Sequence, residues 1–128
     1  MTIIYASLDR PNEKLIALTF AAEALRRGGA KRLALLAPYL CYMRQDTAFH
    51  EGDAISQRVI CALIAGCVDR VVTVDAHLHR TTDIRTVFPG IASDNLSAMP
   101  AISVELRKTG LDPSIVVVGS DAESLPWN

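Results

Sequence analysis

The chain has 128 residues, half of them hydrophobic, and its acidic and basic side chains nearly cancel to a formal net charge of -1. This length suits one domain with a buried core. The composition excludes a disordered tail and a generally basic nucleic-acid-binding protein. We therefore treat residues 1–128 as a single domain in which any anion site has to be local, with no nucleic-acid partner.

The cysteines and the apolar runs indicate the compartment. Cys41, Cys61 and Cys67 are odd in number and have no CxxC spacing, which favours buried free thiols over disulfides or zinc ligands. The first residues lack the length and basic flank of a signal peptide, and no apolar run approaches the roughly 18 residues of a membrane span. These features predict a cytoplasmic protein with no membrane partner.

The first half of the chain predicts two strands and a helix. Apolar and β-branched residues predict a short strand over residues 2–7, and a polar turn follows at residues 8–12. Leu15, Leu18, Ala22 and Leu25 recur at helical spacing, and two glycines at 28–29 end this helix. The unalternating apolar run at 33–37 is typical of a strand covered on both faces, and Pro38 ends it.

The second half predicts further strands and helices. Asp53 is the expected N-cap of a helix over residues 54–67. We expect the third strand at 70–74, a helical turn within 81–88, a short strand at 91–92 before the polar residues 93–95, a helix at 99–108 and a fourth main strand at 115–118.

This alternation predicts a three-layer α/β fold with a mainly parallel sheet and right-handed crossovers. Ligands of such sheets bind beyond the carboxyl ends of the strands. Polar residues follow the expected strands at four places, namely residues 9–10, 39–51, 75–79 and 120–121. We therefore expect these four segments to meet at one edge of the sheet.

Two kinds of chemistry are possible at this edge. Asp75, His77 and Asp121 could share a divalent metal that bridges phosphate oxygens; alternatively, Asp75 caps a turn and His77 makes an ordinary hydrogen bond. Arg44 could bind phosphate or stack on a purine beside nearby aromatic residues; the alternative is a surface ion pair with Asp46. Neither a GxxxxGK[ST] loop nor a strand-linked GxGxxG motif occurs.

Four segments resemble the ribose-phosphate pyrophosphokinases, also called phosphoribosyl pyrophosphate synthetases, in order and spacing. One segment, AKRLALLAPYLCYMRQDTAFHEGDAIS, is similar to the strand and Pro-Tyr-x-x-Tyr-x-Arg-Gln-Asp signature of that family. VDRVVTVDAHLHR is similar to its Asp-x-His strand exit, and FPGIASDNLSAMP and IVVVGSDAES resemble two further blocks. The resemblance covers essentially the whole chain.

The resemblance implies a type I phosphoribosyltransferase-like domain from an enzyme that transfers the β,γ-diphosphoryl group of ATP to the 1-hydroxyl of ribose 5-phosphate. It implies Mg²⁺ as cofactor and a homo-oligomer, or association with a full-length relative. Arg44, Gln45 and Asp46 then belong to the ATP-binding segment. The implied metal ligands are His77, which also contacts the ATP phosphates, Asp121 and the neighbouring Asp75.

The chain also departs from the family. Thr47 stands where the family has a basic residue, and the chain is less than half of the family's length. The family's N-terminal segment and its acidic ribose-phosphate loop have no counterpart, so we expect the ATP and Mg²⁺ side of the site without activity of the chain alone. One alternative is a non-catalytic nucleotide-binding or regulatory paralogue, and another is a structural remnant that binds nothing.

Overall fold

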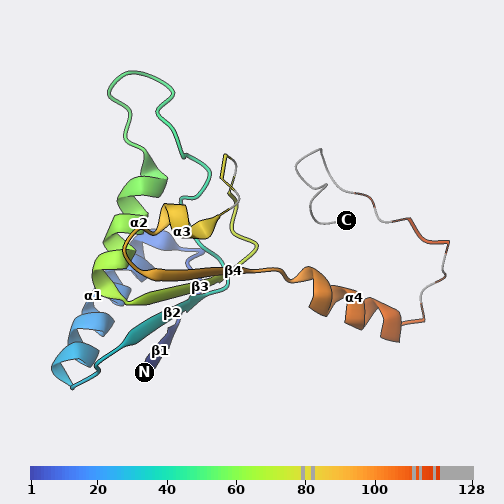
Figure 1. Ribbon diagram of the computed structural model, residues 1–128, viewed down its shortest axis with the longest axis horizontal. Coiled ribbons are helices and arrows are strands. Elements are labelled where there is room, and N and C mark those ends of the chain that lie inside the picture. Colours follow the sequence, from blue (N-terminus) through green and yellow to red (C-terminus); the bar gives the residue numbers. More distant parts are fainter. Residues whose placement is uncertain (79, 82, 111, 113, 117, 119–128) are drawn as a thin grey trace. The chain divides into compact units, whose positions relative to one another are not determined.

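The computed structural model describes residues 1–128 except 79, 82, 111, 113, 117 and 119–128 (Figure 1). The chain divides into two compact units, Met1–Leu96 and Ser97–Asn128, and each is described by itself. The second unit contains helix α4 (Met99–Lys108). The helices of the first are α1 (Pro11–Arg27), α2 (Ser56–Cys67) and α3 (Ile84–Val87), and its strands are β1 (Thr2–Tyr5), β2 (Leu33–Ala37), β3 (Arg70–Val74) and β4 (Ala92–Leu96).

The strands of the first unit form one parallel sheet whose order, β1-β2-β3-β4, follows the chain. Tyr5 lies opposite Leu36 at the end of β1, and Val74 lies opposite Leu96 at the end of β3. The prediction of an α/β fold with a parallel sheet is therefore confirmed. Because the strands are parallel, their carboxyl ends share one edge of the sheet.

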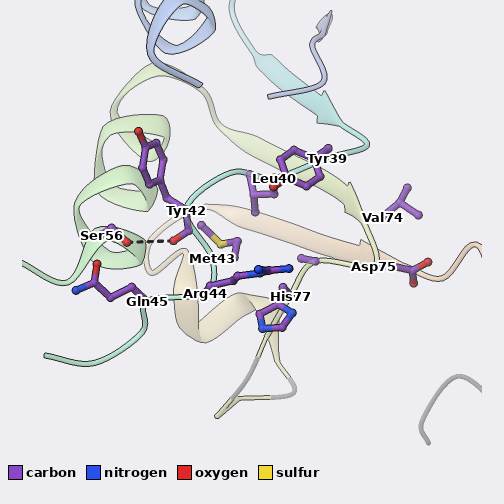
Figure 2. A pocket seen from close by; sticks show the side chains of 11 residues that line it. Tyr39, Leu40, Tyr42, Met43, Arg44, Gln45, Ser56, Val74, Asp75 and His77 are labelled. Atoms are coloured by element: carbon purple, nitrogen blue, oxygen red, sulfur yellow. Dashed lines mark hydrogen bonds between the residues drawn. The ribbon is translucent and has the colours of Figure 1, made fainter. Parts of the chain in front are cut away.

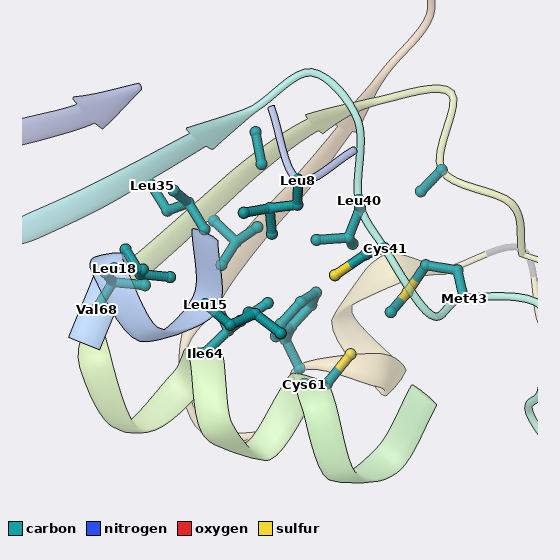
Figure 3. Packing of buried hydrophobic residues seen from close by; sticks show 14 of the residues in the cluster. Leu8, Leu15, Leu18, Leu35, Leu40, Cys41, Met43, Cys61, Ile64 and Val68 are labelled. Atoms are coloured by element: carbon teal, nitrogen blue, oxygen red, sulfur yellow. The ribbon is translucent and has the colours of Figure 1, made fainter. Parts of the chain in front are cut away.

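Helices α1, α2 and α3 lie on the same face of this sheet (Figure 1). Leu35 of β2, which is 0% exposed, packs in the core beneath them. Figure 3 shows this core between the sheet and the helices. It includes Leu15 and Leu18 of α1 and Cys61 and Ile64 of α2. The helical spacing seen in the sequence thus places its apolar residues against the sheet.

The opposite face of the sheet is open within the Met1–Leu96 unit, where the described residues place no helix on it. Ile3 and Tyr5 of β1 are 60% and 69% exposed. Arg70 and Asp94 pair across β3 and β4 with a shortest distance of 2.5 Å, and they line a shallow depression there with Ile3 and other apolar residues. In this unit helices cover β2 on one face and not on both as predicted, although Ala34 on the open face is still only 5% exposed.

Asp69 ties three elements together at the amino ends of the strands. Its carboxylate accepts a 2.7 Å hydrogen bond from the Leu33 backbone N–H and a 2.7 Å ion-pair contact from Arg26 at the end of α1. These contacts, with the Leu33 hydrogen bond as the larger cause, lower the pKa of Asp69. The end of α1, the start of β2 and the start of β3 are thereby held in register.

Helix α2 begins later than the sequence predicted. Its first residue is Ser56 instead of Ala54, and Ile55 occupies the N-cap position without a side-chain hydrogen bond. The predicted cap, Asp53, instead accepts a 2.9 Å hydrogen bond from the His50 backbone N–H. Asp53 therefore closes a turn within the preceding loop, which local hydrogen bonding of Asp often does.

Strand β4 is longer and more polar than the short strand predicted at residues 91–92. Ser93, Asp94 and Asn95, which we expected to follow the strand, lie within it. Their polarity is compatible with a strand because the side chains find partners: Asp94 pairs with Arg70, and Asn95 Oδ1 accepts a 2.9 Å hydrogen bond from the Ala76 N–H. Such partners cannot be recognised from alternation alone.

The second unit confirms one predicted element and not another. Helix α4 has the predicted bounds, Met99–Lys108, and none of its residues is buried. The strand predicted at 115–118 is not formed by its described residues: Ile115, Val116 and Val118 are exposed and lie in no strand. The described part of this unit has no other strand to supply hydrogen bonds, and a strand needs such a partner.

The thiols are free, as predicted, and Cys41 and Cys61 are buried whereas Cys67 is partly exposed. Burial raises the pKa of Cys61 to about 12, which keeps this thiol protonated and unreactive. Among the described residues, no helix is both long and apolar enough to span a membrane.

The one-sided core gives a stability prediction. Leu35→Ala should lower the free energy of unfolding by about 2–5 kcal/mol, because it removes a fully buried side chain. Ile3→Thr keeps a β-branched residue on the open face and should cost about 0.5 kcal/mol or less. Urea denaturation followed by circular dichroism measures both. Similar losses for the two variants would contradict the open face.

Candidate functional site

A cavity of about 270 Å³ lies at the carboxyl edge of the sheet, between the loop that follows β2 and the loop that follows β3. We refer to residues 38–55 as the β2–α2 loop and to residues 75–83 as the β3–α3 loop. Both loops contribute side chains to the cavity (Figure 2). Its lining consists of Tyr39, Leu40, Tyr42, Met43, Arg44, Gln45, Ser56, Val74, Asp75, Ala76 and His77.

Two of the four segments predicted to meet at this edge form the cavity. The first segment does not line it, and Asp9 instead forms an ion pair with Lys14 of α1. This ion pair lowers the pKa of Asp9. The last segment, with Asp121, lies outside the described residues. The prediction is thus confirmed for the β2 and β3 exits.

The first turn of α2 holds the β2–α2 loop in place. Gln57, which is 9% exposed, donates its backbone N–H to the Gln45 carbonyl and its side-chain Nε2 to the Met43 carbonyl, each at 3.2 Å. A buried carbonyl that lost its donor would be costly. These two bonds bracket Arg44, so the helix fixes the backbone from which the Arg44 side chain enters the cavity.

Left-handed backbone conformations occur at a non-glycine residue in each loop. Tyr42 has φ 59° and Asp75 has φ 46°, a region that L-residues seldom adopt and that is common at functional sites. The Tyr42 hydroxyl donates a 2.8 Å hydrogen bond to Asn12 Oδ1 of α1. The Asp75 N–H donates to the Leu96 carbonyl at 2.8 Å, which fixes the β3 exit against β4.

Arg44 is exposed and makes no hydrogen bond or ion pair with the residues that the structure describes. Figure 2 shows its guanidinium on the side of the cavity where His77 lies, whereas the neighbouring Gln45 points the opposite way. The alternative of an Arg44–Asp46 ion pair is not what forms: Asp46 pairs with Arg80 of the β3–α3 loop. The N–H donors of the Arg44 guanidinium are therefore available for a ligand.

The metal prediction rests on Asp75, His77 and Asp121. The first two line the cavity, but their side chains point in different directions in Figure 2. The described residues contain no group of three acidic, His or Cys side chains arranged for a metal. Mg²⁺ in nucleotide sites needs only one or two carboxylates, with phosphates and waters as its other ligands. Asp75 fits that donor set.

Three residues that shape the site were not singled out in the sequence. Gln57 and Asn12 anchor the β2–α2 loop through Met43 and Tyr42, and Arg80 pairs with Asp46. Of the three, only Gln57 could have been recognised from the sequence, because it is a polar residue at a position of α2 that faces the loop and the core. The partners of Asn12 and Arg80 are distant in sequence, and spacing does not reveal them.

Comparison with known proteins gives a consistent family. Residues 1–67 match the model of the N-terminal domain of ribose phosphate pyrophosphokinase. A ribose-phosphate pyrophosphokinase of Methanobrevibacter smithii is 30% identical over 128 residues, which are 99% of this chain and 41% of that protein. One from Corynebacterium efficiens is 36% identical over 122 residues, 94% of this chain and 36% of that protein.

A solved structure agrees with these matches. The crystal structure of phosphoribosylpyrophosphate synthetase from Mycobacterium smegmatis superposes with a TM-score of 0.67 at 27% identity, over 83% of this chain and 34% of that one. This supports the phosphoribosyltransferase-like fold. The chain spans about two fifths of the length of the curated relative from M. smithii.

The anchoring by Gln57 can be tested directly. Gln57→Met keeps the length of the side chain but leaves the Met43 carbonyl without its donor, so the free energy of unfolding should fall by about 1–2 kcal/mol. Hydrogen exchange at residues 43–46 should accelerate. Arg58→Met, at the next and exposed position of α2, is the matched control and should change neither quantity. Unchanged exchange in Gln57→Met would contradict the anchoring role.

Proposed function

Since this chain belongs to the ribose-phosphate pyrophosphokinase family, we propose that its cavity forms the ATP-binding side of a site for diphosphoryl transfer from ATP to ribose 5-phosphate. The observation that carries this proposal is the Arg44 guanidinium. It faces a cavity at the carboxyl edge of a parallel sheet and has no polar partner among the described residues. Ligands of such sheets bind at this edge.

The chemistry of the lining suits a nucleotide. A guanidinium presents a rigid set of donors that matches phosphate oxygens, and Arg44 is the residue we assign to the ATP phosphates. Tyr39 and Tyr42 offer aromatic surface next to it for a flat base. A cavity of about 270 Å³ is slightly smaller than a typical ligand pocket, so it would hold part of the nucleotide.

His77 and Gln45 complete the proposed binding residues. His77 enters the cavity from the β3 exit, opposite the loop that carries Arg44, and an imidazole N–H can donate to a phosphate oxygen. Gln45 lines the cavity on another side. Phosphoryl transfer depends on positioning and charge stabilisation more than on covalent chemistry of the protein. Two donors on separate loops serve that purpose.

Asp75 is the described residue that we expect to hold Mg²⁺ together with the ATP phosphates, and His77 and Asp121 are the further proposed ligands. Bound Mg²⁺ would neutralise part of the phosphate charge. The hydrogen bond from the Asp75 backbone N–H to the Leu96 carbonyl holds the start of the β3–α3 loop, and it thereby fixes the backbone position of Asp75.

The acceptor side of the reaction is not assigned to any described residue. Ribose 5-phosphate would have to bind through groups other than those of the cavity, and the open apolar face of the sheet is compatible with an oligomer or with a longer relative as partner. We therefore propose that the described unit needs further protein surface for the complete reaction.

Nucleotide binding can be measured by calorimetry with ATP and Mg²⁺. Arg44→Ala should weaken the affinity for ATP about 10-fold or more, because it removes a charged donor to phosphate, and it should change the affinity for adenosine much less. Arg32→Ala, an exposed arginine before β2 at the other end of the sheet, is the control and should bind ATP normally. Equal affinity of the Arg44 variant and the wild-type chain would refute this assignment.

The need for further surface has its own measurement. AMP release from ATP and ribose 5-phosphate should be absent for the chain alone at a concentration where ATP binding is saturated. Robust turnover by the chain alone would contradict the proposed division of the site. A folded chain that gives no heat with millimolar ATP and Mg²⁺ would instead favour a structural role.

A further inference from the structure

The two loops that enclose the cavity are joined by an ion pair between Arg80 Nη1 and Asp46 Oδ1. We call this contact the interloop pair. Arg80 lies in the β3–α3 loop with His77, and Asp46 lies in the β2–α2 loop next to Arg44 and Gln45. The pair therefore joins the two segments that carry the proposed phosphate-binding residues.

The surroundings of the pair distinguish it from an ordinary surface contact. The side chain of Asp46 is 8% exposed, whereas that of Arg80 is 54% exposed. A carboxylate withdrawn from water needs a compensating partner, and the loss of that partner leaves a poorly solvated charge. Pairs with both side chains exposed contribute little. The Arg85–Asp83 pair of α3, with 77% and 40% exposed side chains, is of that kind.

Both ends of the interloop pair are attached to helices. Gln45, directly before Asp46, accepts the 3.2 Å hydrogen bond from the Gln57 N–H at the start of α2. Thr81 directly follows Arg80, and its hydroxyl oxygen lies 3.0 Å from the hydroxyl oxygen of Thr86 in α3. The same Thr81 oxygen accepts a hydrogen bond from the backbone N–H of Asp83, which is the N-cap of α3. A contact between two anchored segments can fix the distance between them.

We propose that Arg80 and Asp46 are positioning residues, which set the separation between the Arg44 segment and His77 and so pre-organise the cavity for the ATP phosphates. This inference rests on the proposed function. It assigns Asp46 an indirect role in the ATP-binding segment: its carboxylate is engaged by Arg80, and a carboxylate would repel phosphate. Pre-organisation improves affinity by reducing the loss of loop freedom on binding.

A double-mutant cycle tests this role, with Asp46→Asn, Arg80→Gln and the double variant. Each single variant should weaken MgATP binding about 10-fold, and the double variant should be no weaker than the worse single variant, because residues that act only through each other are not additive. The reversed pair, Asp46→Arg with Arg80→Asp, should recover a large part of the affinity. Arg85→Gln, in the exposed pair of α3, is the matched control and should bind MgATP normally.

Hydrogen exchange of the free protein supplies the second readout. Residues 44–47 and 76–78 should exchange faster in both single variants and return toward wild-type rates in the reversed pair. A direct contact of Arg80 with the ligand would instead weaken MgATP binding without changing exchange, and this result overturns the proposal. The proposal is also overturned if the losses of MgATP affinity in the two single variants add up in the double variant. Single variants with wild-type hydrogen exchange and wild-type MgATP affinity overturn it as well.

The two readouts separate this inference from the function on which it rests. If the wild-type chain does not bind MgATP, the proposed function fails, and the exchange rates still decide whether the interloop pair orders the loops. If the wild-type chain binds MgATP and the variants match it in both measurements, only the positioning role fails.

Discussion

The parallel direction of the strands is the constraint on which the site depends. Because β1 to β4 run the same way, the segments that follow β2 and β3 emerge side by side at one edge of the sheet. Residues separated by a whole helix in sequence, such as Arg44 and His77, thereby line one cavity. The helices pack on one face and secure the sheet, while the edge is left to loops that carry polar side chains.

The loops at this edge are ordered through their backbone hydrogen bonds as much as through their side chains. Gln57 satisfies two carbonyls on either side of Arg44, and Leu96 and Asn95 of β4 accept from the first residues after β3. The side chains next to these anchors line the cavity. Strained conformations at Tyr42 and Asp75 are then maintained by contacts in the surrounding protein.

Strands and helices with a strong local pattern were predictable, and those that depend on distant partners were not. The bounds of β2, β3 and α4 follow from continuous apolar runs and from helical spacing. The polar strand β4 was predicted too short, since Asp94 becomes compatible with a strand only through Arg70. In the site, the residue types around Arg44 and His77 indicated an anion site at a strand edge. The pairing of Asp46 with Arg80 depends on how two loops approach, and one sequence does not encode that in its spacing.

The order of the strands also bears on how this unit folds. Each described strand from β2 onward pairs with the strand that precedes it in the chain, so none of them has to insert between two strands that are already joined. The unit can be assembled during synthesis by adding one helix and one strand at a time to an existing edge. Contacts between neighbouring segments are reached with a smaller loss of chain entropy than contacts between remote ones. The β2–α2 loop is long, but its two ends are brought together as soon as β3 pairs with β2. This pairing does not require α3 or the later part of the chain.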